Sequence, residues 1–370
     1  MNMVRLRKLW FQFHKWIGLL LAIAILPLCV TGFALVWHDP LLRVIHPDRY
    51  AVEGPAALAP ATYADAARAQ LSPGEALTKL TLPGEAGEPV LATATKPVKG
   101  GRPERINIYL DPKDARVIDK EYVGSTVFQV MHVIHGSLMI PEWGRPIVGW
   151  VGVAMVISSL TGIWLWWPLS GSVRRGFRWK RHANTDSNLH YLLGFWISVP
   201  LFVLSLTGVW ISFPSAFSGF DGPRPAATGP SRAAMMRAKP IEQPATPLDA
   251  AVAGAQSAQA GPVRSVTWPT DVKPEWAIEI GRASVTVKDA SGETKVSQPA
   301  GRPPQTLSRT MRQIHDGQGM PFWWQLIVFL GGLLPTVLSI TGIIMWWRAR
   351  KWRGALAERQ RQAAGRKTAG

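Results

Sequence analysis

The sequence is poor in cysteine, and this scarcity limits the chemistry available to it. Cys29 is the one cysteine among 370 residues, and it lies within an apolar run. A single thiol excludes an intramolecular disulfide, a CxxC redox pair, a thiolate zinc site and covalent haem attachment through CxxCH. Any cofactor must therefore be held by other side chains, and the eight histidines are the available candidates.

Acidic residues are also scarce. The chain has 24 Asp and Glu against 41 Lys and Arg, a formal net charge of +17, yet only 18% of its residues are charged and 47% are hydrophobic. This balance excludes an intrinsically disordered chain and differs from that of a basic soluble protein. It indicates strongly apolar segments averaged with polar ones, so membrane-spanning helices are expected.

Four apolar runs are long enough to cross a bilayer, whose hydrocarbon core of about 30 Å needs about 20 helical residues. They cover residues 16–37, 147–167, 189–213 and 322–347. Basic residues precede the first run, as they do in a signal peptide. Its length, Pro27 and the lack of an A-x-A-like cleavage site favour a membrane helix instead.

Basic residues gather in three segments, 1–15, 168–188 and 348–370, which together hold 17 basic and two acidic residues. By the positive-inside rule, these segments and both termini are cytoplasmic. Anionic lipids are their expected partners, and nucleic-acid binding has little support. The predicted parts are the N-terminus with the first helix (1–37), an external domain (38–145), the second helix (146–167), a cytoplasmic loop (168–188), the third helix (189–213), a second external domain (214–321), the fourth helix (322–347) and a basic tail (348–370).

Self-comparison indicates that the chain is a duplication. Matched positions in the first and third apolar runs are separated by 176 residues, and those around the second and fourth runs are separated by 180. The first set pairs His14, Gly18 and Thr31-Gly32 with His190, Gly194 and Thr207-Gly208, and the second pairs His135 and Thr161-Gly162 with His315 and Thr341-Gly342.

Each external segment has the pattern of one helix followed by four strands. The fold class is therefore an α-helical membrane protein with four transmembrane helices in two tandem, parallel repeats, each with an inserted small α+β domain. Pro/Ala/Gly-rich stretches at 51–61 and 219–247 are expected to be linkers. The expected helices cover 61–71 and 246–259, and the strands lie near 77–82, 89–95, 105–110 and 115–119, and near 263–268, 275–280, 284–288 and 294–297.

Four histidines occupy matched positions at two membrane faces. His14 and His190 lie at the cytoplasmic ends of the first and third helices, and His135 and His315 precede the other two on the external side. A pseudo-twofold axis along the membrane normal would bring each pair together. Two axial imidazoles from facing helices suit a six-coordinate haem, so the sequence predicts two non-covalent b-type haems. A metal-ion site and a proton relay are the alternatives.

The repeated glycines and Thr-Gly dipeptides are predicted to pack against these haems. Gly18 and Gly194 follow their histidines by one helical turn, where a missing side chain would admit a flat macrocycle. Close helix packing is the competing interpretation of each glycine. The dipeptides expected at the external level are Thr31-Gly32 and Thr207-Gly208, and those at the cytoplasmic level are Thr161-Gly162 and Thr341-Gly342.

Two further external histidines have no duplicated counterpart. His38 and His132 align by offset with Pro214 and Arg312. Each is a candidate substitute ligand for the outer haem or a contact of the outer site, because the external side is where the symmetry is broken. His46 and His182 have the setting of ordinary loop residues.

Short motifs run along nearly the whole chain. They are Arg7, His14-Lys15-Trp16-Ile17-Gly18, the Thr-Gly dipeptides, His135-Gly136, His315-Asp316-Gly317, the terminal Trp-Trp-Arg and the turn Tyr109-Leu110-Asp111-Pro112. In these motifs the chain resembles the PepSY-associated transmembrane family of bacterial inner membranes. The resemblance implies b-type haems and an inner-membrane location, and the family includes dihaem ferric-siderophore reductases. PepSY domains are also linked to peptidase inhibition.

These observations predict an oxidoreductase of the ferric-chelate reductase type, with no catalytic residue assigned. Electrons would cross the membrane and reduce the Fe(III) of a ferric siderophore, whose oxygen-rich chelate holds Fe(II) less tightly. The cytoplasmic pieces are too short for a flavin or nucleotide domain, so the donor is a separate cytoplasmic reductase or a membrane quinol. The alternatives are a PepSY sensor or peptidase regulator without haem, and a metal-ion transporter.

Overall fold

A computed structural model describes residues 3–99, 101, 103–167, 174, 177–179, 182–222, 230–297 and 305–368. The chain divides into two compact units. The helical unit comprises residues 1–37, 131–223 and 306–370, and the sheet unit comprises residues 38–130 and 224–305. Parts of the predicted loop (168–173, 175–176, 180–181) and of the second linker (223–229) lie outside the described residues.

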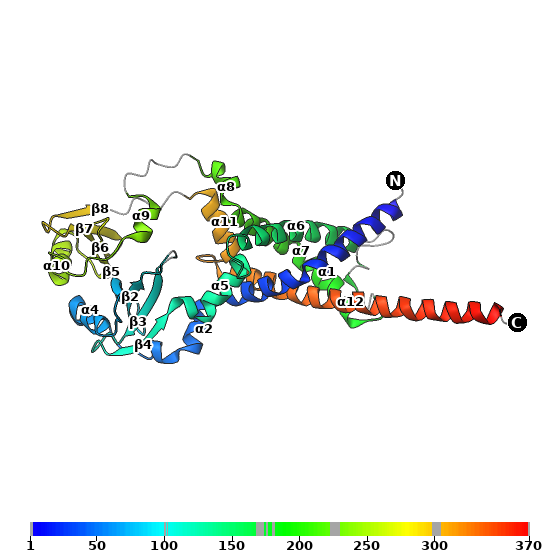
Figure 1. The fold of residues 1–370 in the computed structure, drawn as a ribbon, viewed down its shortest axis with the longest axis horizontal. Helices are drawn as coiled ribbons and strands as arrows, with labels where there is room; N and C mark the ends of the chain where they lie inside the picture. Colours follow the sequence, from blue (N-terminus) through cyan, green and yellow to red (C-terminus); the bar gives the residue numbers. More distant parts are fainter. Residues whose placement is uncertain are drawn as a thin grey trace. The chain divides into compact units, whose positions relative to one another are not determined.

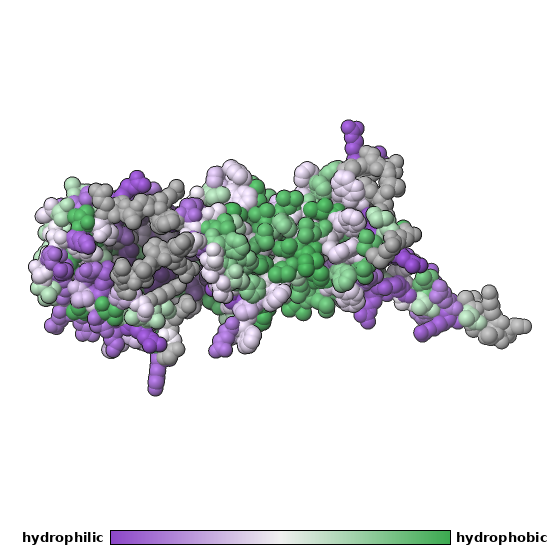
Figure 2. All heavy atoms as spheres, turned by 90° about the horizontal axis from the view of Figure 1, so that it is seen from above, coloured by the Kyte–Doolittle hydropathy of each residue, from purple (hydrophilic) through white to green (hydrophobic). Residues whose placement is uncertain are grey.

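Four long helices form the helical unit (Figure 1). Each is long and apolar enough to cross a membrane, and Figure 2 shows their hydrophobic residues gathered in a band between more polar ends. α1 and α7 each pack against α6 and α12, so α1 and α7 occupy opposite corners of a four-helix bundle. The helices are α1 (Met3–Val36), α6 (Gly144–Trp166), α7 (Thr185–Ser212) and α12 (Phe322–Thr368).

Two of the helices extend beyond the apolar runs that predict them. α1 begins at Met3, and α12 continues to Thr368. The added basic segments contain no proline and are rich in Leu, Arg, Lys, Ala and Gln. These residues have high helix propensity, so the helix continues where the hydropathy signal stops.

Glycines allow the bundle helices to approach closely at specific points. A Cβ added to Gly332 of α12 would lie 2.8 Å from the Cys29 carbonyl oxygen of α1, and one added to Gly152 of α6 would lie 2.9 Å from Val209 of α7. Any side chain at these two glycines would force the helices apart.

Two short helices precede α6 and α12. They are α5 (Val127–Ser137), whose residues from Met131 onward belong to the helical unit, and α11 (Leu307–Asp316), which packs against α7. The Thr306 hydroxyl accepts a hydrogen bond from the Arg309 amide and caps the start of α11. Gly317 ends this helix with a φ of +71°, a left-handed conformation that glycine adopts without strain.

The sheet unit differs from the two small domains that the sequence predicts. Its eight strands form one antiparallel sheet in the order β4-β3-β2-β1-β5-β6-β7-β8. The two halves join where β1 pairs with β5, with Leu80 opposite Val266. The strands are β1 (Ala76–Thr81), β2 (Val90–Lys96), β3 (Glu104–Leu110), β4 (Val117–Tyr122), β5 (Val263–Thr267), β6 (Glu275–Ile280), β7 (Ala283–Lys288) and β8 (Thr294–Ser297), each within three residues of its expected position.

Two helices and the sheet share a single core. α4 (Pro60–Arg68) packs against the first half of the sheet, and α10 (Leu248–Ala258) packs against the second half and against α4. Tyr63, Leu80 and Trp276 are among the buried residues of this core. Because β1 and β5 each have a free edge to pair and apolar side chains to bury, joining the halves is more favourable than leaving two exposed sheet edges.

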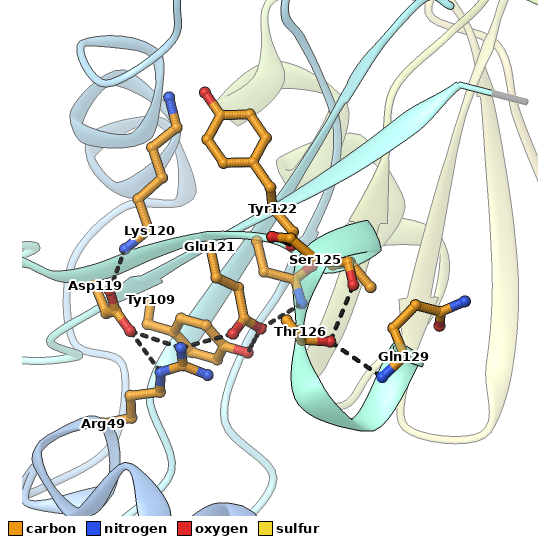
Figure 3. A network of polar contacts seen from close by, with 11 residues as sticks. Arg49, Tyr109, Asp119, Lys120, Glu121, Tyr122, Ser125, Thr126 and Gln129 are labelled. Carbon is orange, nitrogen blue, oxygen red and sulfur yellow. Dashed lines mark hydrogen bonds and ion pairs between the residues drawn. The ribbon is translucent and has the colours of Figure 1, made fainter. Parts of the chain in front are cut away.

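A buried arginine fastens the start of the sheet unit to strand β4 (Figure 3). Arg49 lies in the last turn of the short helix α3 (Pro47–Tyr50), and its guanidinium donates hydrogen bonds to Asp119 at 2.8 Å and to Glu121 at 2.6 Å. The Tyr109 hydroxyl donates to the other oxygen of Glu121 at 2.7 Å. Burial raises the pKa of Glu121, but the hydrogen bonds from Arg49 and Tyr109 outweigh it and hold that pKa below its ordinary value.

Replacing Arg49 with methionine is expected to loosen β4, because Glu121 would remain largely buried without its cation. Breaking a buried ion pair costs about 3–5 kcal/mol, and we expect about 2–3 kcal/mol here because Asp119 is 38% exposed and can be hydrated. Amide hydrogen exchange of β4 in the full chain measures this loss. Arg116→Gln, which removes an exposed cation 3.6 Å from Asp111, is the matched control and should leave β4 protected.

The same contact predicts acid sensitivity. A carboxylate with a lowered folded-state pKa stabilises the fold above the unfolded value of about 4.3 and loses that contribution as the pH falls through the folded value. Protection of β4 should therefore decrease below about pH 4 in the wild type. The Arg49→Met chain should show a much smaller decrease, and an equal decrease in both would contradict this role of the pair.

Candidate functional site

The bundle brings together both predicted histidine pairs. His14 of α1 and His190 of α7 have ring centroids 6.5 Å apart. His135 of α5 and His315 of α11 have ring centroids 6.0 Å apart. The diagonal placement of α1 and α7 explains why His14 and His190 lie close together, since the starts of these two helices face the bundle axis from opposite sides.

The two pairs lie at opposite ends of the bundle. His14 contacts Thr161 near the end of α6, whereas His135 contacts Thr31 near the end of α1. Seventeen residues of α1 separate His14 from Thr31. At 1.5 Å per residue, the two pairs are about 25 Å apart along the helix axis.

A threonine holds each of the four imidazoles through its Nδ1 atom. Each threonine comes from one of the Thr-Gly dipeptides, and each lies in the same half of the sequence as its histidine. In the second pair a backbone carbonyl adds to the contact: Leu28 O lies 2.9 Å from His135 Nδ1 and Leu204 O lies 3.0 Å from His315 Nδ1. The Nδ1 to Oγ1 distances are 3.0 Å for His14 and Thr161, 3.1 Å for His190 and Thr341, 3.5 Å for His135 and Thr31, and 3.1 Å for His315 and Thr207.

The hydrogen-bond partners favour one tautomer of these rings. Each of the four threonine hydroxyls lies within hydrogen-bonding distance of a carbonyl of its own helix, as Thr341 does of Val337 at 2.8 Å. A hydroxyl that donates its one proton there accepts from the imidazole, and the Leu28 and Leu204 carbonyls beside His135 and His315 can only accept. This arrangement favours the form with the proton on Nδ1 and the lone pair on Nε2, which is the form that binds a metal.

The glycine of each dipeptide makes room for the imidazole. A Cβ added to Gly32 would lie 2.9 Å from His135 Cε1, and one added to Gly208 would lie 3.1 Å from His315 Cε1. For Gly162 and Gly342, the corresponding distances to His14 and His190 are 3.4 and 3.5 Å. The Thr-Gly dipeptide is thus a histidine cradle, in which threonine orients the ring and glycine admits it.

This cradle is the part of the site that sequence reasoning missed. The dipeptides are predicted to pack against a cofactor, but their direct contacts are with the histidines. The available signal was the recurrence of a threonine at the same sequence spacing in both halves. It follows His14 and His190 by 17 residues, and it follows His135 and His315 by 26 residues. Gly18 has no atom within 4 Å of an added Cβ, and Gly194 has only Leu338 at 3.9 Å. Helix packing does not require either glycine, and their contact with a cofactor stays a prediction.

Burial favours the neutral form of the imidazoles in the second pair. Burial is the main cause that lowers the pKa of His135 to about 4, and the neighbouring His315 adds to the effect. Burial also lowers the pKa of His315. Asp316 beside it is largely buried, which raises the pKa of its carboxyl group. A neutral ring can bind a metal without first losing a proton.

The spacing of each pair fits one metal atom between two imidazoles. With a metal–nitrogen bond of about 2.0–2.1 Å and about 1.1 Å from a ring nitrogen to the ring centre, two axial imidazoles have centroids about 6.3 Å apart. The observed 6.5 and 6.0 Å lie on either side of that value. Among the described residues, no cluster of three or more His, Cys, Asp and Glu side chains could hold a metal. Each pair could supply two imidazole ligands to a metal whose other ligands came from a cofactor, as those of a haem iron do.

The remaining histidines lie outside the two pairs. His38 belongs to the sheet unit, where its Nδ1 lies 2.6 Å from Asp39 and its ring packs on Phe128. His132 is exposed on α5, one turn before His135. His182 stacks on Tyr191, and the His46 amide donates to the Leu42 carbonyl. The assignment of His38 and His132 as substitute ligands stays a prediction.

Removing a cradle hydroxyl should weaken cofactor binding more at the first pair than at the second. Thr161 Oγ1 lies 3.0 Å from His14 Nδ1, and Ser158 adds a side-chain contact at 3.5 Å and a backbone contact. Thr31 Oγ1 lies 3.5 Å from His135 Nδ1, and the Leu28 carbonyl is the closer partner at 2.9 Å. Loss of an outer-shell partner typically costs 10–100-fold in metal affinity. We expect a loss of about that size for Thr161→Val and about threefold for Thr31→Val, measured by haem titration. Equal losses would contradict the role of the Leu28 carbonyl.

The chain is a helical membrane protein whose second unit contains an antiparallel sheet packed against helices α4 and α10. A family model described as the PepSY-associated TM region matches residues 11–349. The chain therefore belongs to this family, as its motifs predict. A comparison with curated proteins gave no match.

Proposed function

We propose that this protein is a dihaem b electron-transfer protein of the bacterial inner membrane. One observation carries the proposal: two pairs of imidazoles have the spacing of axial ligands, and each ring is held at Nδ1 with its Nε2 available. His14 and His190 would hold one haem, and His135 and His315 the other. Bound haem would supply a one-electron Fe(III)/Fe(II) couple at each position.

The protein residues would set the position and potential of these couples. The threonines and the Leu28 and Leu204 carbonyls fix the ring orientation, and their hydrogen bonds increase the basicity of the Nε2 ligands. The spacing of about 25 Å along α1 suits transfer between the two faces of a bilayer of about 30 Å.

We further propose the orientation and the acceptor. The basic N-terminal segment and C-terminal tail favour cytoplasmic termini, with the two repeats crossing the membrane in the same direction. The acceptor that best matches the resemblance to dihaem reductases is a ferric siderophore on the periplasmic side, so the activity is that of a ferric-chelate reductase. One electron converts Fe(III) to Fe(II), which oxygen-rich chelators hold less tightly. A cytoplasmic reductase or a membrane quinol would supply the electron.

The first test is the dithionite-reduced minus oxidised spectrum of the detergent-purified full chain, with haem quantified as the pyridine haemochrome. We expect sharp α and Soret bands and about two b-type haems per chain. Reduced protein mixed with a ferric siderophore and a colorimetric Fe(II) trap should then be reoxidised as Fe(II) appears. A colourless protein after expression with added haem would overturn the proposal. A dihaem protein that ferric chelates leave reduced would overturn the acceptor alone.

A further inference from the structure

A groove separates α1 from α12 at the end of the bundle that carries both chain termini. Its volume is about 560 Å³, and it lies where both helices change from apolar to basic sequence. Three of its lining residues are basic, two are tryptophans and one is a glycine. They are Lys15, Arg350, Arg353, Trp16, Trp346 and Gly354.

The charges in the groove have one sign. Among the described residues that line it, none is acidic, so Lys15, Arg350 and Arg353 give it a local charge of +3. Lys15 Nζ lies 4.8 Å from the Trp16 ring centre, and Arg350 Cζ lies 5.6 Å from that of Trp346. These cation–π contacts hold two of the cations against indole faces. Three cations around one concave surface are suited to a phosphate group.

An exposed apolar stripe extends from the groove along α1. Trp16, Leu20 and Ile23 are spaced by four and then three residues, so they lie on the same face of the helix. They are 46%, 68% and 85% exposed. The stripe leads from the cationic groove into the apolar span, and its length of about 10 Å matches the upper part of an acyl chain rather than any soluble anion.

We propose that this groove binds the headgroup phosphate of an anionic phospholipid, with an acyl chain along Trp16, Leu20 and Ile23. Lys15, Arg350 and Arg353 hold the phosphate, and the two indoles lie at the level of the glycerol backbone, where tryptophan is favoured in membranes. Basic pockets between membrane helices recognise anionic headgroups in this way. The proposal is independent of haem binding, because none of the lining residues is an axial ligand or part of a Thr-Gly cradle.

The test is native mass spectrometry of the delipidated full chain titrated with phosphatidylglycerol. The wild type should show one site at least tenfold tighter than its sites for phosphatidylcholine. The Lys15→Gln, Arg350→Gln, Arg353→Gln triple variant should lose that site. A second variant, Leu20→Ser with Ile23→Ser, should weaken binding several-fold while keeping every charge, and glycerol 3-phosphate should not compete.

A matched control removes the same charge elsewhere on α12. The Lys351→Gln, Arg359→Gln, Arg361→Gln variant also loses three cations, but none of them lines the groove. It should bind phosphatidylglycerol like the wild type. Equal loss in the control would overturn the proposal in favour of general attraction, and competition by glycerol 3-phosphate would overturn it in favour of a free anion. Unchanged lipid binding in the groove variant together with lost haem would overturn it by assigning the cations to the cofactor.

Discussion

Replacing either His14 or His315 with alanine is expected to lower the haem content from about two to about one per chain. Each substitution leaves a single imidazole of its pair, since the paired ring centroids lie 6.5 and 6.0 Å apart. A six-coordinate iron needs both axial ligands, and the two sites lie about 25 Å apart, so losing one should not empty the other. The pyridine haemochrome measures the loss directly.

The remaining histidines supply the controls for this experiment. His132→Ala removes an exposed side chain one turn from His135, and His38→Ala removes one that pairs with Asp39. Both variants should keep two haems, whereas the His14→Ala, His315→Ala double variant should keep almost none. If His132→Ala lost a haem and His315→Ala did not, the assignment of the second pair would be wrong.

Replacing Gly32 with valine should weaken haem binding at the His135 and His315 pair. The added Cβ alone would lie 2.9 Å from His135 Cε1, so the ring must leave its hydrogen bonds to the Leu28 carbonyl and Thr31. Overpacking of this kind costs about 1–3 kcal/mol, which corresponds to a 5- to 150-fold weaker site when that energy is taken from cofactor binding. Haem titration followed by reduced-minus-oxidised spectra would resolve the two sites.

Two further glycine substitutions serve as controls for Gly32→Val. Gly136→Ala changes the residue next to His135 at a point where an added Cβ meets no atom within 4 Å, so it should bind haem normally. Gly162→Ala places a Cβ 3.4 Å from His14 Cε1 and should weaken the first site only slightly. If Gly32→Val retained both haems with unchanged spectra, the cradle role of this glycine would be refuted.

Much of the architecture is readable from the sequence because it depends on local patterns. The four membrane helices follow from apolar runs of about 20 residues, and all eight strands follow from short alternating runs bounded by turn residues. The continuation of α1 and α12 through basic sequence was not predicted, since hydropathy does not report helix propensity. The histidine pairs were predictable because the duplicated spacing places matched residues at the same depth.

Contacts that depend on tertiary packing could not be predicted in the same way. Thr161 holds His14 across 147 residues, and the sequence does not specify which helix of the bundle lies beside α1. The sequence pattern of the Thr-Gly dipeptides is the same whether they contact a histidine ring or the edge of a cofactor. The sequence also does not predict that the eight strands form a single sheet. A strand pattern indicates which face of a strand is buried, but not which strand edges pair.

The pairing of β1 with β5 has a consequence for the order in which the protein is made. Thr81 pairs with Ser265, so the central contact of the sheet joins residues 184 positions apart. Synthesis produces β1 to β4 and three of the four long helices before β5 exists. Until then, the β1 edge has unpaired backbone groups that could pair with a strand of another chain. Completion of the sheet therefore depends on insertion of the second half, which makes the two halves of this protein a single unit of biogenesis.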